Sequence, residues 1–334
     1  MQLCVDLDKI FQNAVTVKRI CEEAGVQLRA ALKSYYCRDA IVRVLQNAGV
    51  EKFCTTGLPG RSLSVQIPRH RLHWLKLLPP GGHFEQVTIG CSSSLHSETS
   101  TVSRASACAA RNALLHEYIV SVDIGDRRDG ISPSEFPSFL AACRRYHHEY
   151  FRCGGISVNH TCCELAIPVE EHFREVSTIL AICKEEEAGS CECFSVGGSV
   201  VLGYFLNGGS LAPYNEVRVG GALLVGEIEF FPGSVPGLRN PFQICSNILE
   251  VKKKLVRGKV CRRAILDFGS IHADMGQTHP AEPLLNIVGW SSEYTVLDCT
   301  ERPDIAVGDE LRFWLGYQAM ARAMSCSLLE KVFL

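Results

Sequence analysis

Residues 28–39, Leu28-Arg-Ala-Ala-Leu-Lys33-Ser-Tyr-Tyr-Cys-Arg38-Asp39, pass from a strand pattern to a helix pattern. The apolar run that begins at Leu28 is typical of a strand, and it ends at Lys33. A polar turn follows, and a helical pattern begins at Asp39. A lysine at the end of a strand can lie in a dry pocket, where desolvation makes it a nucleophile toward carbonyl groups. Most lysines are exposed to water, so the rest of the chain has to decide whether Lys33 is reactive.

The composition is that of an ordinary globular protein. The chain has 334 residues, which is enough for one large domain or two domains. Its net charge is −2, so we expect no basic surface for nucleic acid. No apolar run is long enough to span a membrane, and the N-terminus lacks the pattern of a signal peptide. We therefore expect a cytoplasmic protein that binds neither nucleic acid nor membrane.

The chain contains 17 cysteines, many of them inside or beside apolar runs. This placement favours reduced, buried thiols that behave as small hydrophobic side chains, and we expect no disulfide framework. Two stretches, Cys191-Glu-Cys193 and His160-Thr-Cys162-Cys163, contain residue types that bind metals. Neither has the paired C-x-x-C spacing of a zinc site, so we expect no metal.

Up to residue 226 the chain alternates between strand-like runs and helical patterns. The run that ends at Lys33 is the first strand, and we expect seven more at residues 52–56, 62–67, 86–91, 118–124, 155–159, 192–196 and 215–219. Later helical patterns cover residues 71–78, 99–116, 134–150 and 169–187. This alternation predicts a closed (β/α)8 barrel, with a doubly wound open sheet as the alternative. Barrel sites form at the carboxyl ends of the strands, where Lys33 lies.

After residue 226 the pattern changes to strands with almost no helix until the C-terminus. We expect strands at residues 228–231, 243–253, 260–268, 284–288, 294–299 and 310–315. The sequence therefore predicts a barrel domain at 1–226 and a smaller all-β domain at 227–334.

Two late strand ends of the barrel carry glycine-rich turns. In Val217-Arg218-Val-Gly220-Gly221, a charged side chain inside an apolar strand needs a partner, and the glycines let the backbone approach an anion. The stretch 195–199, Ser-Val-Gly-Gly-Ser, offers further small donors. Such loops after the last two strands are the usual phosphate site of a barrel. A third turn, after the strand at 118–124, carries Arg128, which can bind an oxyanion.

The order of these motifs resembles the fold-type III pyridoxal-phosphate enzymes, which are alanine racemase and its relatives. Within them the chain is most similar to the ornithine racemase branch. The resemblance covers nearly the whole chain, and the motifs that carry it are the lysine after the first strand and residues 122–131, 155–159, 217–221, 288–298 and 313–324.

The resemblance implies a role for each matching residue. Lys33 would form the Schiff base with pyridoxal phosphate and act as a base on one face of the cofactor. Arg218 would face the pyridine nitrogen, which stays unprotonated because a guanidinium only donates hydrogen bonds. Arg128 would lie near the phenolic oxygen, and Asn159 takes the place of a histidine that packs on the ring. The phosphate would be held by Ser199, Gly220, Gly221 and Tyr317.

The resemblance also implies a homodimer in which each all-β domain completes the partner's site. Ser292 and Glu293 would then contact the substrate, and the carboxylate suits an amino acid with a distal positive charge. Alanine racemase has a catalytic tyrosine after a glycine in this domain, but this chain has Gly269-Ser270. The second acid or base is then His272, Asp274, Tyr294 or none of them.

We therefore expect a racemase or epimerase of a free amino acid, such as ornithine or lysine. A decarboxylase or lyase on the same scaffold is the alternative, because decarboxylation needs no matching second base. A non-catalytic pyridoxal-phosphate carrier is a third reading, but carriers of this family lack the all-β domain.

Overall fold

The computed structural model describes residues 1–32, 39–58, 67–160, 162–163, 168–186, 191–229, 231 and 233–334. Lys33 lies outside the described residues. The helices and strands follow one another as β1 (Gln2–Val5), α1 (Leu7–Glu23), β2 (Gln27–Ala31), α2 (Asp39–Asn47), β3 (Lys52–Thr55), β4 (Leu72–Trp74), α3 (Phe84–Gly90), β5 (Ser93–His96), α4 (Thr99–Asn112), β6 (His116–Val122), α5 (Phe136–Cys143), β7 (Phe151–Asn159), α6 (Glu170–Glu186), β8 (Cys193–Gly197), α7 (Val200–Leu206), β9 (Glu216–Val219), α8 (Gly221–Leu224), β10 (Phe242–Val256), β11 (Lys259–Leu266), β12 (Thr278–Pro280), β13 (Asn286–Trp290), β14 (Thr295–Asp298), β15 (Glu310–Leu315), α9 (Tyr317–Ser325) and β16 (Glu330–Phe333).

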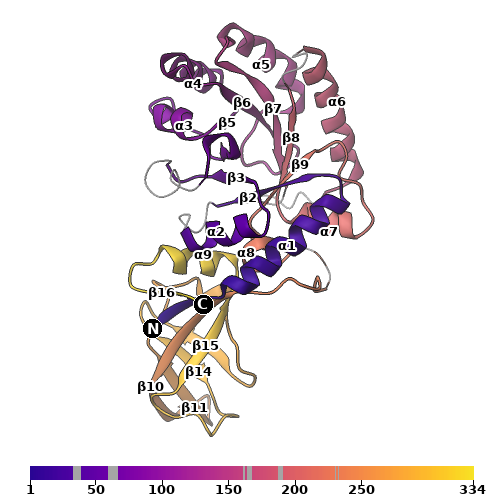
Figure 1. Cartoon of the computed structure of the whole chain (residues 1–334). Coiled ribbons are helices and arrows are strands. Elements are labelled where there is room, and N and C mark those ends of the chain that lie inside the picture. Colours follow the sequence, from indigo (N-terminus) through magenta and orange to yellow (C-terminus); the bar gives the residue numbers. More distant parts are fainter. Residues whose placement is uncertain are drawn as a thin grey trace.

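Strands β2 to β9 form a closed parallel barrel, with helices packed around its outside (Figure 1). The barrel closes where β2 pairs with β9, and this register sets Arg29 beside Arg218. The strands are almost entirely buried because helices cover their outer faces and side chains fill the interior. The predicted fold class, a (β/α)8 barrel with an all-β domain, is confirmed.

Two of the predicted elements before residue 100 were wrong. Residues 71–78 are not a helix, because β4 runs from Leu72 to Trp74. Residues 86–91 are not a strand, because residues 86–90 belong to α3, which ends at Gly90. Helix α3 buries Phe84, Val87 and Thr88, whose spacing forms one helical face, so tertiary packing overrides the β propensity of this run. The fourth and fifth barrel strands are β4 and β5, and most of the strand predicted at 62–67 lies outside the described residues.

The second part of the molecule is an eight-stranded sheet with the order β12-β15-β10-β11-β14-β13, to which β1 and β16 are joined. Strand β1 pairs antiparallel with β10 and parallel with β16, so both ends of the chain lie in this sheet (Figure 1). The strand predicted at 228–231 is not formed at Ile228 and Glu229. The domain boundary at 226/227 stays a prediction, and β1 lies outside the barrel.

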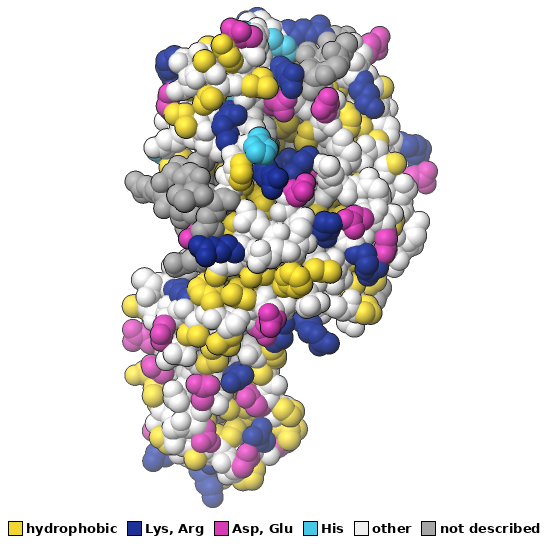
Figure 2. Space-filling model, in the orientation of Figure 1, with side chains coloured by type: hydrophobic (Ala, Val, Ile, Leu, Met, Phe, Trp, Pro, Cys, Tyr) yellow, Lys and Arg dark blue, Asp and Glu magenta, His cyan; other side chains and the backbone are white. Residues whose placement is uncertain are grey.

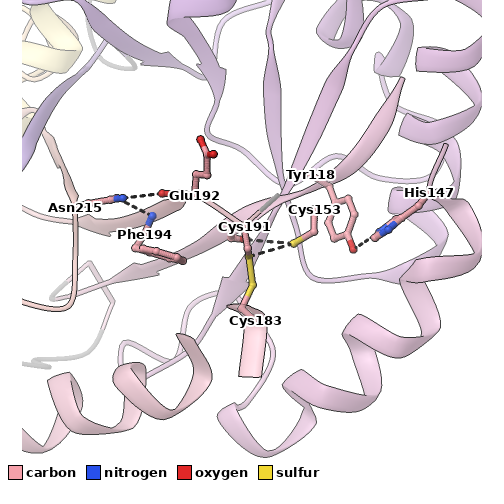
Figure 3. The surroundings of a disulfide bond; sticks show 9 residues. Tyr118, His147, Cys153, Cys183, Cys191, Glu192, Phe194 and Asn215 are labelled. Atoms are coloured by element: carbon pink, nitrogen blue, oxygen red, sulfur yellow. Dashed lines mark hydrogen bonds between the residues drawn. A yellow bond between two sulfur atoms is a disulfide. The ribbon is translucent and has the colours of Figure 1, made fainter. Parts of the chain in front are cut away.

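One pair of cysteines contradicts the expectation of reduced thiols throughout. Cys183 in α6 and Cys191 form a disulfide, and the thiol of Cys153 in β7 lies 3.8 Å from the sulfur of Cys191 (Figure 3). The pair forms because the chain turns back after α6 toward the start of β8, which brings the two Cα atoms to 6.4 Å. The other cysteines that the structure describes have free thiols.

The surface carries mixed charges. On the face that Figure 2 shows, Lys and Arg side chains are interspersed with Asp and Glu, and hydrophobic side chains gather in a band where the barrel meets the sheet. Among the described residues, no helix combines the length and the apolar character that a membrane crossing requires.

Candidate active site

A cavity of about 570 Å³ opens at the carboxyl ends of the barrel strands. Seven residues that the sequence singled out line it: Arg128, Asn159, Ser199, Arg218, Gly220, Gly221 and Tyr317. Six of them follow or end strands β6 to β9, and parallel strands in a barrel end at the same rim. Tyr317 comes from α9, which follows the last long strand of the sheet domain. The cavity is therefore built by the barrel and closed on one side by the C-terminal part of the chain.

Arg218 is a buried cation that faces this cavity. Its Nη1 donates to the hydroxyl of Ser195 (2.8 Å), and its Nη2 donates to the carbonyl of Val158 (2.7 Å). Burial lowers the pKa of Arg218 from its ordinary value, yet an arginine stays charged in a protein. The guanidinium therefore offers hydrogen-bond donors only.

Gly197 leaves the space in front of Arg218 open. A Cβ atom at this position would lie 2.3 Å from Asn159 Oδ1 and 2.6 Å from Arg218 Nη2. Both of those side chains are anchored by other hydrogen bonds, so neither can move away without breaking them. A glycine is therefore required at this position.

Ser199, Gly220, Gly221 and Tyr317 form a small polar cradle at one end of the cavity. The hydroxyl of Ser199 accepts a hydrogen bond from the backbone N–H of Ala222 (3.1 Å). A Cβ atom at Gly220 would lie 3.5 Å from the Tyr317 hydroxyl, and one at Gly221 would lie 3.4 Å from Ser199 Oγ. Two hydroxyls beside glycines, which let the backbone approach a ligand closely, suit an anion such as a phosphate.

A buried carboxylate, Asp126, anchors the cavity-lining Asn159. It accepts hydrogen bonds from the Asn159 amide (2.9 Å) and from the backbone N–H groups of Cys162 and Cys163 (2.7 and 2.8 Å). Burial by itself raises the pKa of Asp126, but these hydrogen bonds hold that pKa below its ordinary value. Arg128 Nε lies 4.0 Å from Asp126 and donates to Asp129 (2.6 Å). Asp126 therefore holds the side chain of Asn159 against the cavity.

The model of the alanine racemase N-terminal domain matches residues 5–227 of the chain. The chain belongs to the alanine racemase family. Over 99% of its length it is 24% identical to ornithine racemase from Acetoanaerobium sticklandii and 23% identical to lysine racemase from Thermotoga maritima, and each match covers 98% of the relative.

Among solved structures, alanine racemase from Streptomyces lavendulae has the same fold, with a TM-score of 0.75 and 17% identity; the match covers 100% of this chain and 97% of that one. D-threonine aldolase from Filomicrobium marinum also shares the fold, with a TM-score of 0.73, 14% identity and coverage of 99% and 91%.

The family's Schiff-base lysine would be Lys33, which the structure does not describe. Ala31, two residues earlier, lines the cavity. The role of Lys33 therefore stays a prediction, and the described strand β2 ends at the cavity wall.

The residues predicted for the opposite face of the site do not line this cavity. Those residues are His272, Asp274, Ser292, Glu293 and Tyr294. They come together in the sheet domain, because the backbone N–H groups of Ser270 and Ile271 donate to the carbonyls of Ser291 and Ser292 (3.0 and 3.1 Å). We call residues 269–274 and 291–294 the paired loops.

The three candidates for a second acid or base, His272, Asp274 and Tyr294, differ in their exposure to solvent and in their hydrogen bonds. His272 is buried, and its Nδ1 accepts a hydrogen bond from the N–H of Gly269 (3.0 Å). Burial lowers the pKa of His272. Asp274 accepts a hydrogen bond from the N–H of Gly276 (2.9 Å) and so stabilises a local turn. Tyr294 has 49% of its surface exposed. Tyr294 is therefore the most accessible of the three candidates for a second acid or base.

Sequence reasoning missed Glu216, Arg29 and Asp126. Arg29 lies in an apolar strand, and Glu216 lies two positions before Arg218, so strand alternation places Glu216 on the same face as Arg218. A charge inside an apolar strand needs a partner, so Arg29 carries the same sequence signal as Arg218.

Proposed function

We propose that this chain is a pyridoxal-phosphate-dependent racemase or epimerase of a free amino acid with a basic side chain, such as ornithine or lysine. The proposal rests on one observation. Arg218, which can only donate hydrogen bonds, and the polar cradle line the same cavity. Similarity to the ornithine and lysine racemases, at 24% and 23% identity, supports a basic substrate.

The residues of the cavity fit pyridoxal phosphate. The cradle of Ser199, Gly220, Gly221 and Tyr317 suits the phosphate, because two hydroxyls lie beside glycines that allow close approach of the backbone. Arg218 suits an unprotonated pyridine nitrogen, which only accepts hydrogen bonds. Gly197 keeps free the space that a ring would need, since even a Cβ atom there would contact Arg218 and Asn159.

Each residue then has a limited task. Pyridoxal phosphate, when bound, withdraws electrons from the α-carbon of an amino acid and so acidifies its proton. Lys33 would attach the cofactor and remove or return that proton on one face. Arg218 would hold the pyridine nitrogen without protonating it, and Asn159, anchored by Asp126, would support the ring.

We further propose that the enzyme is a homodimer in which the paired loops complete the partner's cavity. Tyr294 would supply the second acid or base, because it is exposed, and Glu293 would bind the distal ammonium group of the substrate. Large hydrophobic side chains are exposed in the same domain, as an interface would require; they include Ile271, Leu284, Val288, Trp290 and Tyr294.

Chirality measurements test this function. The purified protein with pyridoxal phosphate is incubated separately with L- and D-ornithine, lysine and alanine, and the enantiomers are separated by chiral chromatography. We expect racemisation of ornithine or lysine to exceed that of alanine, and Lys33→Ala to abolish both the activity and the yellow colour of the protein. Racemisation of neutral amino acids only would contradict the proposed substrate class.

A lyase or decarboxylase is the second candidate. It is favoured by Ser270, which stands where alanine racemase has its catalytic tyrosine. This candidate would be established by release of carbon dioxide, or of an aldehyde from a β-hydroxy amino acid, while the remaining amino-acid substrate is not racemised. A non-catalytic carrier is disfavoured by the eight-stranded sheet, which carriers of this family lack.

A further inference from the structure

A chain of buried polar groups runs beneath the cavity, from Arg218 through Ser195 to Glu216 and Arg29. Ser195 Oγ lies 2.8 Å from Arg218 Nη1 and 2.8 Å from Glu216 Oε1. The carboxylate of Glu216 binds Arg29 through both oxygens, at 2.7 and 2.8 Å. All four residues are buried in the barrel interior, and only Arg218 reaches the cavity.

The proton of Ser195 can point in one direction only. An arginine donates hydrogen bonds and never accepts them, and a carboxylate accepts them and never donates. Ser195 has a single hydroxyl proton, so it must accept from Arg218 and donate to Glu216. The carboxylate therefore determines which way the hydroxyl turns, and the hydroxyl in turn holds Nη1 of Arg218. The second anchor, the carbonyl of Val158, holds Nη2.

Glu216 also balances the charges of the barrel interior. Arg29 and Arg218 lie side by side in the register of β2 and β9, and Lys52 Nζ lies 3.5 Å from Glu216. Within the described part of the chain, no other carboxylate lies within 4.0 Å of these three cations. Burial would raise the pKa of Glu216, but the Arg29 guanidinium holds that pKa far below its usual value. Glu216 is therefore ionised at neutral pH.

We propose that Glu216 is a positioning residue for Arg218: acting through Ser195, it fixes the orientation of the guanidinium that faces the cavity. The proposal rests on the proposed function, because Arg218 matters for catalysis only if a pyridine nitrogen binds there. Ser195 and Val158 each accept one hydrogen bond from Arg218, and these two bonds fix the plane of the guanidinium that lines the cavity. Loss of the Ser195 anchor would let the guanidinium rotate away from the ligand.

Two substitutions separate orientation from charge. Ser195→Ala removes the link and leaves the Glu216–Arg29 pair intact. Glu216→Gln keeps an acceptor for Ser195 but removes the negative charge and turns one oxygen into a donor that faces Arg29. The matched control is Glu117→Gln, because Glu117 also binds an arginine of a neighbouring barrel strand, Arg152 (3.0 and 2.8 Å), away from the cavity.

The first measurement needs no cofactor and no activity. Arginine side chains are labelled with ¹⁵N, and the Nη signals of Arg218 are assigned with Arg218→Lys in protein free of pyridoxal phosphate. We expect two distinct Nη signals in the wild type and in Glu117→Gln, and merged, exchange-averaged signals in Ser195→Ala. In Glu216→Gln the signals should shift. Unchanged Arg218 signals in both Ser195→Ala and Glu216→Gln would refute the positioning role.

The second measurement uses the enzyme loaded with pyridoxal phosphate. We expect Ser195→Ala to lower kcat by about 10- to 100-fold with little change in KM, as a displaced reacting group does, and to shift the absorption band of the bound cofactor. Equal losses in Ser195→Ala and Glu117→Gln would contradict the proposal. If the wild type proves inactive while the NMR signals behave as expected, the positioning role stands and the proposed function fails.

Discussion

The barrel interior beneath the cavity and the paired loops of the sheet domain hold their polar groups in opposite ways. In the barrel, Glu216 and Arg29 are buried and bound to each other across 187 positions of sequence. In the paired loops, backbone hydrogen bonds join nearby segments, and Tyr294 remains exposed. A buried network fixes its members only when every one is satisfied, whereas an exposed loop stays available to another surface. In the proposed dimer, the barrel would provide the fixed half of the site, and the paired loops would provide the half that meets the partner.

The largest expected effect is on the stability of the protein, and it comes from the buried Glu216–Arg29 pair in the barrel. Glu216→Ala leaves Arg29 buried without its partner, which should lower the free energy of unfolding by about 3–5 kcal/mol. Urea unfolding followed by circular dichroism measures this change. The control in the sheet domain is Asp304→Asn, which breaks an exposed pair with Arg302 and should leave the unfolding curve unchanged. Equal stability of the two variants would show that burial does not separate the two regions.

A second pair of substitutions compares glycines in the two regions. Gly197→Ala should weaken the binding of pyridoxal phosphate by about 10- to 100-fold, because the new Cβ atom would press on Arg218 and Asn159. Gly289→Ala in β13 should have no effect, since nothing lies within 4 Å of its Cβ position. Titration of the apoprotein with the cofactor, followed by absorbance, measures both. Unimpaired binding by Gly197→Ala would place the cofactor elsewhere.

Acid should destabilise the barrel through its buried histidines, because burial lowers the pKa of His73, His96 and His116. Ser94 Oγ lies 2.8 Å from His96 Nε2 and 2.7 Å from His116 Nε2, and burial lowers the pKa of these two histidines to about 3. The unfolded chain takes up these protons below about pH 6.5 while the folded chain does not, so stability falls as the pH drops from 6.5 toward 3.

At pH 5 the expected loss is about 2 kcal/mol for each of these histidines. Unfolding by urea at pH 7 and at pH 5 measures it. His96→Gln should remove about 2 kcal/mol of the total loss at pH 5, which is the share of one such histidine. An unchanged loss in this variant would show that His96 does not contribute.

The smallest expected effect is on self-association, and it comes from the exposed surface beside the paired loops. Trp290 has 53% of its surface exposed in β13, next to the paired loops. Trp290→Glu should weaken self-association by about tenfold or more, because aromatic side chains dominate the energy of interfaces. Sedimentation velocity over a range of concentrations measures the dimer. A monomeric wild type would remove the proposed role of the paired loops in the partner's site.

Much of the fold could be predicted from the sequence, because the barrel repeats one local pattern. Strand-like runs that end in glycine-rich turns indicated where β8 and β9 finish, and Arg218 stood out as a charge in an apolar strand. Short or polar elements could not be predicted in this way. Strand β4 has only three residues, which is too few for a periodicity. Helix α3 contains the β-branched run Val87-Thr88-Ile89, which favours a strand, and its helical face is set by packing. The pairing of Cys183 with Cys191 likewise depends on where the chain turns after α6.

The sequence by itself determined the class of the fold and the strand ends that carry Arg218, Gly220 and Ser199, because periodicity and turn chemistry are local properties. Only the tertiary structure decided which distant groups meet. Closure of the barrel between β2 and β9 brings Arg29 to Glu216, and the sheet that takes up β1 brings the first strand to the last. These contacts depend on register and closure across most of the chain, and no local pattern contains that information.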